Sequence, residues 1–287
     1  MLDRVLIPLH PGDLMAVVAR PGHGKSSFMA YMARRVARQL QQANVADRCV
    51  VYVTWEQSIE EIEAFFQSGG SYTSTDMAWG RVPREVIIRN SFSRPALPVW
   101  LMGSSIMKAD QAKPPMTVEM VYEALRGLRA RFGLRPALVC LDYLQIIPVA
   151  RASERTEQVA NATIEAKALA LDLGCPIIGG VQAARGVDRY ENPIPTMGDA
   201  QHSSAIEQTA DKQIALWRPI KNEEAKGKSE RRQSVVIGGV QYDITPELLV
   251  IRVLKQRFDV GHGTYAVRFV PQTLEMADYE VRDLCDF

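Results

Sequence analysis

The chain has 287 residues, of which 47% are hydrophobic and 23% charged, and these proportions suit one large soluble α/β domain. Its 34 Lys and Arg nearly balance 33 Asp and Glu, which excludes a globally basic nucleic-acid-binding protein and confines any polyanion site to a local patch. We expect a cytoplasmic protein without membrane contact or zinc, because the sequence lacks a secretory signal, a run of ~20 apolar residues and a C-x-x-C pair among its four cysteines.

The first part of the chain alternates apolar strands with helices. Residues 14–19 form an apolar run that predicts a strand, and a loop rich in Gly and Pro follows at 20–24. Apolar residues then recur every four positions through 25–42, which predicts an amphipathic helix. A second apolar strand is expected at 49–54 and a second helix at 58–67. Continuous apolar runs of this kind favour a parallel sheet that is covered on both faces.

The segment that follows is less regular. Residues 69–84 are mixed and polar, without a clear period. Short strands are expected at 85–90 and 99–102, and a loop rich in Ser, Lys and Pro at 103–115. Thr117 then begins a predicted helix that runs to Phe132.

The strand–helix alternation resumes in the second half. A buried strand at 137–141 ends in Asp142, a helix spans 155–173 and stops at Gly174, and another strand follows at 176–181. The order of these elements predicts a mostly parallel, doubly wound sheet.

After a strand at 212–217 the character of the sequence changes. Residues 221–234 carry a run of charges, which we expect to be a mobile, solvated loop. Strands at 248–254 and 265–270 flank a Gly-His-Gly turn and predict an antiparallel hairpin at one sheet edge. Without an internal repeat or a recognisable linker, residues 1–287 are expected to form a single domain.

The loop after the first strand has the character of a phosphate-binding loop. Residues 19–26 read A-R-P-G-H-G-K-S and match the P-loop pattern G-x-x-x-x-G-K-[S/T] except at the first position. Two glycines let the backbone wrap a phosphate, Lys25 would reach the β- and γ-phosphates of ATP, and the Ser26 hydroxyl would ligate Mg²⁺. A glycine-bearing turn before a helix is the alternative. The residues predicted to bind nucleotide are Arg20, Pro21, Gly22, His23, Gly24, Lys25, Ser26 and Ser27.

Polar side chains follow three of the predicted strands. Asp142 could hold Mg²⁺ opposite Ser26, and Glu56 could orient and deprotonate the water that attacks the γ-phosphate. Gln182 could sense the γ-phosphate and relay its loss to the next loop. Each has a simpler alternative. Asp142 could be a carboxylate that merely ends a strand, Glu56 could belong to a helix N-cap region, and Gln182 could form a strand-terminal hydrogen bond.

These strand ends, in this order after a P-loop, resemble the C-terminal ATPase domain of the DnaB-type replicative helicases. LDYLQII at 141–147 is similar to the family's Walker B segment, and 155–178 resembles the helix and strand that lead to its sensor glutamine. SSAIEQTAD at 203–211 and KQR at 255–257 match two further family motifs.

The resemblance implies a RecA-like P-loop fold that hydrolyses Mg-ATP and moves along single-stranded DNA. It also implies a homo-oligomer, a hexameric ring by analogy, in which Lys255 and Arg257 reach the ATP site of the adjacent subunit and stabilise charge on the transferred phosphoryl group. A loader or primase is a possible partner. We expect the chain to lack the family's separate N-terminal helical domain.

Two loops, at 149–157 and 185–202, leave the sheet near the predicted catalytic edge. Loops at these positions line the central channel in RecA-like rings and filaments, where basic residues would bind phosphates in a salt-dependent way. Acidic residues are interspersed in both loops, so solvated loops are a close alternative. The residues predicted to bind nucleic acid are Arg151, Arg155, Arg185 and Arg189.

The sequence therefore favours an ATP-dependent DNA helicase or translocase. Two alternatives stay open at this point. One is a recombinase-like or KaiC-like ATPase that assembles rings or filaments on nucleic acid without unwinding. The other is a non-catalytic adaptor that binds nucleotide only to stabilise an interface.

Overall fold

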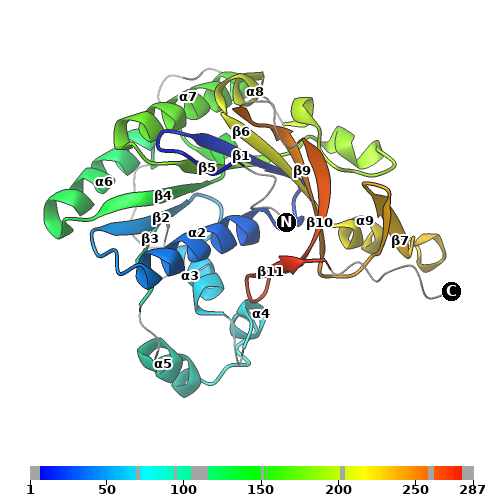
Figure 1. Ribbon diagram of the computed structural model, residues 1–287, viewed down its shortest axis with the longest axis horizontal. Coiled ribbons are helices and arrows are strands. Elements are labelled where there is room, and N and C mark those ends of the chain that lie inside the picture. The colour runs from blue at the N-terminus through cyan, green and yellow to red at the C-terminus, as the bar shows by residue number, and fades with distance from the viewer. Residues whose placement is uncertain are drawn as a thin grey trace.

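A mixed sheet of nine strands runs through the centre of the molecule (Figure 1). The computed structural model describes residues 7–68, 72–93, 96–104, 116–149, 152, 154–200, 204–257 and 262–279. The strands of the sheet are β1 (Leu14–Ala19), β2 (Arg48–Thr54), β3 (Val99–Met102), β4 (Arg135–Asp142), β5 (Ile177–Gln182), β6 (Lys212–Trp217), β9 (Leu248–Lys255), β10 (Gly263–Val270) and β11 (Glu275–Asp278).

In space the strands follow the order β11-β10-β9-β6-β1-β5-β4-β2-β3. The six strands from β6 to β3 are parallel to their neighbours, whereas β9, β10 and β11 are added antiparallel at one side. This arrangement confirms the expected mostly parallel sheet with a C-terminal antiparallel hairpin. The hairpin is not itself the sheet edge, because the unexpected strand β11 pairs with β10 beyond it.

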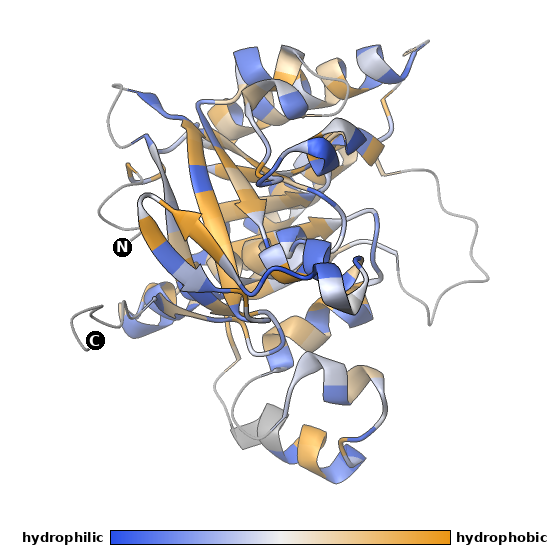
Figure 2. Ribbon diagram, turned by 90° about the vertical axis from the view of Figure 1, so that its right-hand side faces the viewer, coloured by the Kyte–Doolittle hydropathy of each residue, from blue (hydrophilic) through white to orange (hydrophobic). Residues whose placement is uncertain are grey.

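Helices cover both faces of the sheet. The helices α2 (Lys25–Gln42) and α3 (Ile59–Gln67) lie on one face, and α6 (Val118–Phe132) and α7 (Arg155–Leu173) on the other (Figure 1). Two apolar clusters form the core, one on each side of the sheet. All six residues of β1 are buried, because successive side chains point alternately into one cluster and the other. Figure 2 shows the resulting band of apolar strands between helices of mixed character.

The ends of the main helices follow from local sequence chemistry. Ser58 and Glu61 form a capping box at the start of α3, since each side chain accepts a hydrogen bond from the other residue's backbone N–H. The Thr117 hydroxyl caps α6, and α7 stops where Gly174 adopts a φ of 56°. These signals place the helices within a residue of the ranges expected from the sequence.

The strand expected at residues 85–90 is absent, and this prediction is wrong. These residues belong to the helix α5 (Arg84–Ser93), which lies away from the sheet in Figure 1. The run Val86, Ile87, Ile88 is β-branched and favours a strand locally. However, the Pro83 carbonyl accepts the backbone N–H groups of Val86 and Ile87 and starts a helical turn, and within the described ranges no neighbouring strand pairs with this segment.

The charge run at 221–234 is ordered, contrary to the expectation of a mobile loop. It includes most of the helix α9 (Pro219–Glu224) and leads into β7 (Ser234–Ile237), which pairs with β8 (Val240–Asp243) in a small second sheet. Glu223 organises the turn. Its carboxylate is only 1% exposed, lies 3.0 Å from both Lys226 Nζ and Arg232 Nε, and also accepts the Arg232 backbone N–H at 2.8 Å.

Two other short helices were not expected from the sequence pattern, namely α4 (Ser74–Ala78) and α8 (Ser204–Thr209). Cys49, Cys140 and Cys175 are buried free thiols, as expected, and Cys285 lies outside the described residues. Within the described ranges, none of the helices combines the length and the apolar character that crossing a bilayer demands.

Candidate active site

Four strand ends, three of them polar, meet at one edge of the sheet because their strands are parallel and in register. Ala19 at the end of β1 is paired with Gln182 at the end of β5, and Thr54 at the end of β2 is paired with Asp142 at the end of β4. A cavity of about 300 Å³ opens at this edge. It is lined by the glycine loop, by Glu56, Gln57 and Phe65, by Gln182, and by Arg218. Lys25, Ser26, Glu56 and Gln182, four of the residues predicted to act on ATP, are thus brought to a single cavity.

The glycine loop presents the start of a long helix to this cavity. Gly22 and Gly24 have φ angles of 78° and 89°, which L side chains rarely adopt. Helix α2 begins at Lys25 with no acidic residue in its first turn and no side-chain cap among the described residues. Its first N–H groups therefore lack intrahelical partners and point, with the positive end of the helix dipole, at the cavity. This arrangement suits a bound phosphate.

Lys25 connects the loop to two carboxylates. Its Nζ lies 3.1 Å from Asp142 Oδ1 and 3.7 Å from Glu56 Oε2, and it sits 3.7 Å from the centre of the Tyr143 ring. Asp142 is fully buried, so the lysine provides the positive charge that a buried carboxylate requires.

A tyrosine that the sequence analysis did not single out holds the other oxygen of Asp142. The Tyr52 hydroxyl donates a hydrogen bond of 2.8 Å to Asp142 Oδ2. Burial, together with the nearby Asp142 carboxylate, raises the pKa of Tyr52 well above its usual value, so this hydroxyl stays protonated and remains a donor. Among the described residues, Asp142 Oδ1 accepts no hydrogen bond of regular geometry. Apart from its ion pair with Lys25, that oxygen could serve as a ligand of a metal ion.

Two glycines of β5, Gly179 and Gly180, lie where a side chain would have too little space. A Cβ atom at Gly180 would lie 3.1 Å from each of Asp142 Oδ1, Lys25 Cδ and Met29 Sδ, and one at Gly179 would lie 2.8 Å from the Leu144 side chain. Gly180 thus allows close packing beneath the loop, and Gly179 allows close packing against Leu144 on the other face of the sheet. This signal was visible in the sequence but was given no role.

Glu56 occupies the rim of the cavity. Its side chain is 53% exposed and belongs to the turn between β2 and α3. That turn is anchored by the Trp55 backbone N–H, which donates to the Asp142 carbonyl at 3.0 Å, and by the Thr54 hydroxyl, which donates to the Gln57 carbonyl at 2.9 Å. A carboxylate held in this position can reach a water molecule in the cavity.

The backbone of Gln182 is fixed while its side chain faces the cavity. The buried Gln145 amide donates to the Gln182 carbonyl at 3.0 Å and accepts the Gln182 N–H at 3.1 Å. Gln145 lies three residues after Asp142, so the two segments that carry predicted site residues are joined by a paired hydrogen bond. Sequence reasoning did not identify Gln145.

Arg218 is a further cavity residue that the sequence analysis missed. It follows the end of β6, at the same edge as the other strand ends, and its guanidinium donates to the Pro246 carbonyl at 2.6 Å. The side chain is only 8% exposed, and its Nε has no hydrogen-bond partner within the described part of the chain. Its position directly after an apolar strand could have identified it in the sequence as a residue at this edge of the sheet.

His23 attaches the glycine loop to Arg218. Its Nδ1 accepts the Arg218 backbone N–H at 3.1 Å, and its side chain is buried. Burial lowers the pKa of His23 from 6.5 to about 4, an effect that the nearby Asp188 opposes only in part. The imidazole is therefore neutral near pH 7 and acts as an acceptor in the loop.

The depressed pKa of His23 predicts a pH-dependent loss of stability. As the pH falls from 6.5 towards 4, the unfolded chain binds a proton at His23 that the folded chain excludes, so the free energy of unfolding decreases. We expect a decrease of about 2 kcal/mol from this residue between pH 7 and pH 5. Urea unfolding of His23→Asn should show a shallower pH dependence than the wild type. The variant His10→Asn keeps His23 and should keep the wild-type dependence; equal slopes for His23→Asn would contradict the assignment.

The comparison with known proteins agrees with this geometry. Residues 1–276 match the model of the family described as "DnaB-like helicase C terminal domain". The chain belongs to this family. Over 268 residues it is 25% identical to the replicative DNA helicase DnaC of Bacillus subtilis and 26% identical to the replicative DNA helicase DnaB of Geobacillus stearothermophilus. Each alignment covers 90% of this chain but 56% of the relative, so the chain spans little more than half the length of these proteins.

Solved structures show the same fold. A structure described as an ATPase domain superposes with a TM-score of 0.74 and 20% identity, covering 97% of this chain and 89% of the other. A DnaB-like replicative helicase, solved in a study of its interactions with primase, superposes with a TM-score of 0.72 and 20% identity, covering 97% of this chain and 62% of the other. The RecA-like fold expected from the resemblance is thereby confirmed.

Lys255 and Arg257 do not reach the glycine loop of their own chain. Strand β9 is antiparallel to β6, and Lys255 is paired with Gln213 near the start of β6, at the edge opposite the cavity. Lys255 Nζ donates to the Glu207 carbonyl at 2.7 Å, and Arg257 forms an ion pair with Asp211. In one chain these two basic residues are therefore held at the far edge of the sheet.

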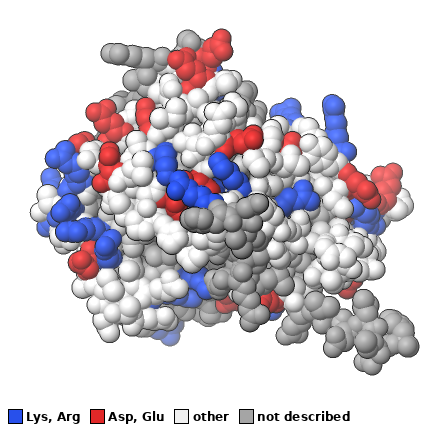
Figure 3. Space-filling model, turned by 45° about the horizontal axis from the view of Figure 1, so that its top comes forward, with Lys and Arg blue, Asp and Glu red and all other residues white. Residues whose placement is uncertain are grey.

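The basic residues predicted to bind nucleic acid are exposed where they are described. Arg155 is the first residue of α7, and Arg185 and Arg189 belong to a short 3-10 helix after β5. Arg151 lies outside the described residues. On the face seen in Figure 3, Lys and Arg lie among Asp and Glu and form no large area of one sign. On this face, a contact with a phosphate backbone would thus depend on a few basic residues.

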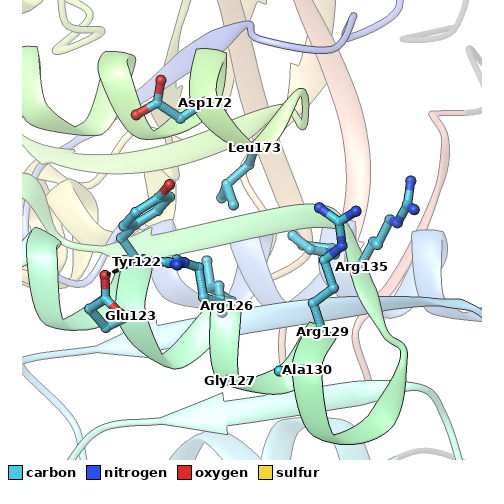
Figure 4. Close-up of a pocket in the computed structure, with 11 residues that line it drawn as sticks. Tyr122, Glu123, Arg126, Gly127, Arg129, Ala130, Arg135, Asp172 and Leu173 are labelled. Atoms are coloured by element: carbon cyan, nitrogen blue, oxygen red, sulfur yellow. Dashed lines mark hydrogen bonds and ion pairs between the residues drawn. The ribbon is translucent and has the colours of Figure 1, made fainter.

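A larger cavity of about 710 Å³ lies elsewhere, between α6, the end of α7 and the start of β4 (Figure 4). Tyr122, Arg126 and Arg129 of α6 line it together with Arg135, the first residue of β4. Asp142 ends that same strand at the opposite edge. The larger cavity therefore contains none of the predicted site residues, and size alone does not identify the active site.

Proposed function

We propose that this chain is the ATPase motor domain of a DnaB-type DNA helicase, which hydrolyses Mg-ATP at subunit interfaces and moves along single-stranded DNA. The observation that carries the proposal is the convergence of Lys25, Glu56 and Asp142 beside a glycine loop at the start of α2. Family membership and the shared fold support the same function.

Each residue of the site would have a separate role in phosphoryl transfer. The N–H groups of the glycine loop and Lys25 would bind the β- and γ-phosphates of ATP. Ser26 and Asp142 fit a Mg²⁺ ion, because Asp142 is buried and its Oδ1 is without a regular hydrogen bond among the described residues. When bound, Mg²⁺ would supply positive charge to the phosphate oxygens. Glu56 would accept a proton from the attacking water, and Gln182 would detect the γ-phosphate.

A complete site requires a second copy of the chain in this proposal. Lys255 and Arg257 lie at the edge of the sheet opposite their own cavity. If subunits stack edge against edge in a closed ring, the pair from one subunit would face the cavity of the next. There the two cations would stabilise the charge that develops during transfer. A hexamer is our expected assembly, and a primase or loader is its expected partner.

Replacing Glu56 tests the proposed chemistry. We expect Glu56→Gln to lower ATP hydrolysis by about 10²- to 10⁴-fold, because the amide cannot accept the water's proton, while ATP binding is retained. Steady-state phosphate release and titration with a fluorescent ATP analogue would measure the two effects. The matched control is Glu63→Gln, which removes an exposed carboxylate from α3 and should behave as the wild type.

Two results would contradict the proposal. Unchanged hydrolysis in Glu56→Gln would remove the catalytic role of the glutamate. Hydrolysis by the wild type without separation of a forked DNA duplex would instead favour an ATPase that assembles on nucleic acid without unwinding it.

A further inference from the structure

An arginine of the glycine loop is bound directly to the loop that follows β5. Arg20 Nε lies 3.0 and 3.2 Å from the two carboxylate oxygens of Asp188, and its Nη2 lies 2.8 Å from Oδ2. The third nitrogen, Nη1, donates to the Ala183 carbonyl at 3.2 Å. One guanidinium thus joins the phosphate-binding loop to the residue after Gln182 and to Asp188.

The segment 183–200 behaves structurally as one closed unit. Ala183 and Ala200 form an antiparallel bridge at its base, and the Ala184 N–H donates to the Asp199 carbonyl at 2.7 Å. The Tyr190 hydroxyl donates to Asp199 Oδ1 at 2.9 Å, which ties the tip back to the base. Because the segment is cross-linked in this way, a displacement at Asp188 would affect the whole loop.

This closed loop carries Arg185 and Arg189, two of the exposed residues proposed to hold a nucleic-acid backbone. Asp188 lies between them in the same 3-10 helix. The Arg20 side chain is 16% exposed and also lines the nucleotide cavity, whereas Asp188 is 43% exposed. Arg20 is therefore a point at which the proposed phosphate site and the proposed nucleic-acid loop touch.

We propose that Asp188 is a positioning residue that transmits the state of the phosphate site, through Arg20, to the loop 183–200 and so sets its affinity for single-stranded nucleic acid. A phosphate in the cavity competes with Asp188 for the Arg20 guanidinium and shifts the backbone of the glycine loop. Either change weakens the two-point contact between the Arg20 guanidinium and the Asp188 carboxylate. The inference rests on the proposed function, since it requires both a nucleotide and a nucleic-acid strand.

The energetics separate this coupling role from a purely structural one. A partly exposed ion pair contributes little to folding stability, so loss of Asp188 should leave the fold and the melting temperature unchanged. A coupling between two sites typically changes affinity by about tenfold, which is readily measured.

The test compares Asp188→Asn with two controls in the full chain. Glu191→Gln removes an exposed carboxylate three residues along the same loop, and Asp188→Glu keeps the charge. Fluorescence anisotropy with a labelled oligo-dT strand would give its affinity in the presence of ADP and of a non-hydrolysable ATP analogue. In the wild type, the affinity for the strand should differ between the ADP state and the ATP-analogue state. We expect the ratio of the tighter to the weaker affinity to fall about tenfold in Asp188→Asn and to keep its wild-type value in both controls. Stimulation of ATP hydrolysis by the strand should fall in parallel, with basal hydrolysis unchanged.

Three outcomes would overturn the inference. If Asp188→Asn keeps the wild-type ratio and stimulation, the ion pair does not couple the sites, although the proposed function stands. If the affinity ratio falls in Glu191→Gln as well, loss of any acidic charge on the loop explains the effect. If the wild type itself shows neither a nucleotide-dependent affinity nor stimulation, the proposed function fails together with the inference.

Discussion

Replacing Lys25 with Met is expected to lower ATP hydrolysis by about 10³-fold or more and also to destabilise the nucleotide-free protein. The loss of hydrolysis follows from the proposed contact of the ammonium group with the β- and γ-phosphates. The loss of stability has a separate cause. Asp142 is fully buried, and Lys25, whose Nζ lies 3.1 Å from Oδ1, is the nearest cation recorded for it among the described residues.

The size of the second effect follows from the cost of an unpaired buried charge. With methionine at position 25, the Asp142 carboxylate keeps, among the described residues, only the hydrogen bond from Tyr52. Removing one partner of a buried ion pair typically costs about 3–5 kcal/mol, and we expect a decrease of about 3 kcal/mol in the free energy of unfolding. Urea unfolding without nucleotide would measure it.

A double variant separates the two effects. In Lys25→Met combined with Asp142→Asn, the buried position no longer carries a charge, so most of the lost stability should return while hydrolysis stays absent. Lys221→Met provides the control, because Lys221 pairs with Glu224 on the exposed surface of α9 and its loss should change neither quantity. Wild-type stability in the single variant would show that Asp142 does not need the lysine.

Replacing Arg257 with Ala is expected to lower hydrolysis by about 10³-fold without preventing folding or ATP binding. The fold should tolerate the change because Asp211 keeps two other contacts, the Lys167 ammonium at 2.6 Å and the Leu14 N–H at 2.8 Å. Arg257 is 59% exposed, so it is accessible to a neighbouring subunit.

Mixing experiments would show that Arg257 acts on the neighbour's site. In an equal mixture of Arg257→Ala and Lys25→Met subunits, about one interface in four joins an intact cavity to an intact Arg257, so hydrolysis should return to about a quarter of the wild-type rate. A mixture of Lys25→Met and Glu56→Gln should stay inactive, because both residues belong to the same subunit's cavity. Absence of recovery in the first mixture, with mixed oligomers verified by mass, would contradict a role in trans.

Much of the fold could be predicted because the local sequence preferences and the burial of these segments favour the same secondary structure. The apolar runs that became β1, β2, β4, β5 and β6 are buried on both faces, and the capping residues Ser58 and Thr117 begin helices where expected. Prediction was wrong where tertiary contacts override local preference. Glu223 orders a charge run that looks fully solvated in the sequence, and Val86 to Ile88 form a helix because, among the described residues, no strand pairs with them.

The sequence by itself indicated the kind of site, because a glycine loop between an apolar strand and an amphipathic helix leaves N–H groups without intrahelical partners, and these favour an anion. It also indicated which strands end in polar residues. Only the tertiary structure decided which of these side chains meet: Lys25 with Asp142, Tyr52 with Asp142, and Arg20 with Asp188. These partners lie about 90 to 168 positions apart, and the register of parallel strands, not any local pattern, brings them together.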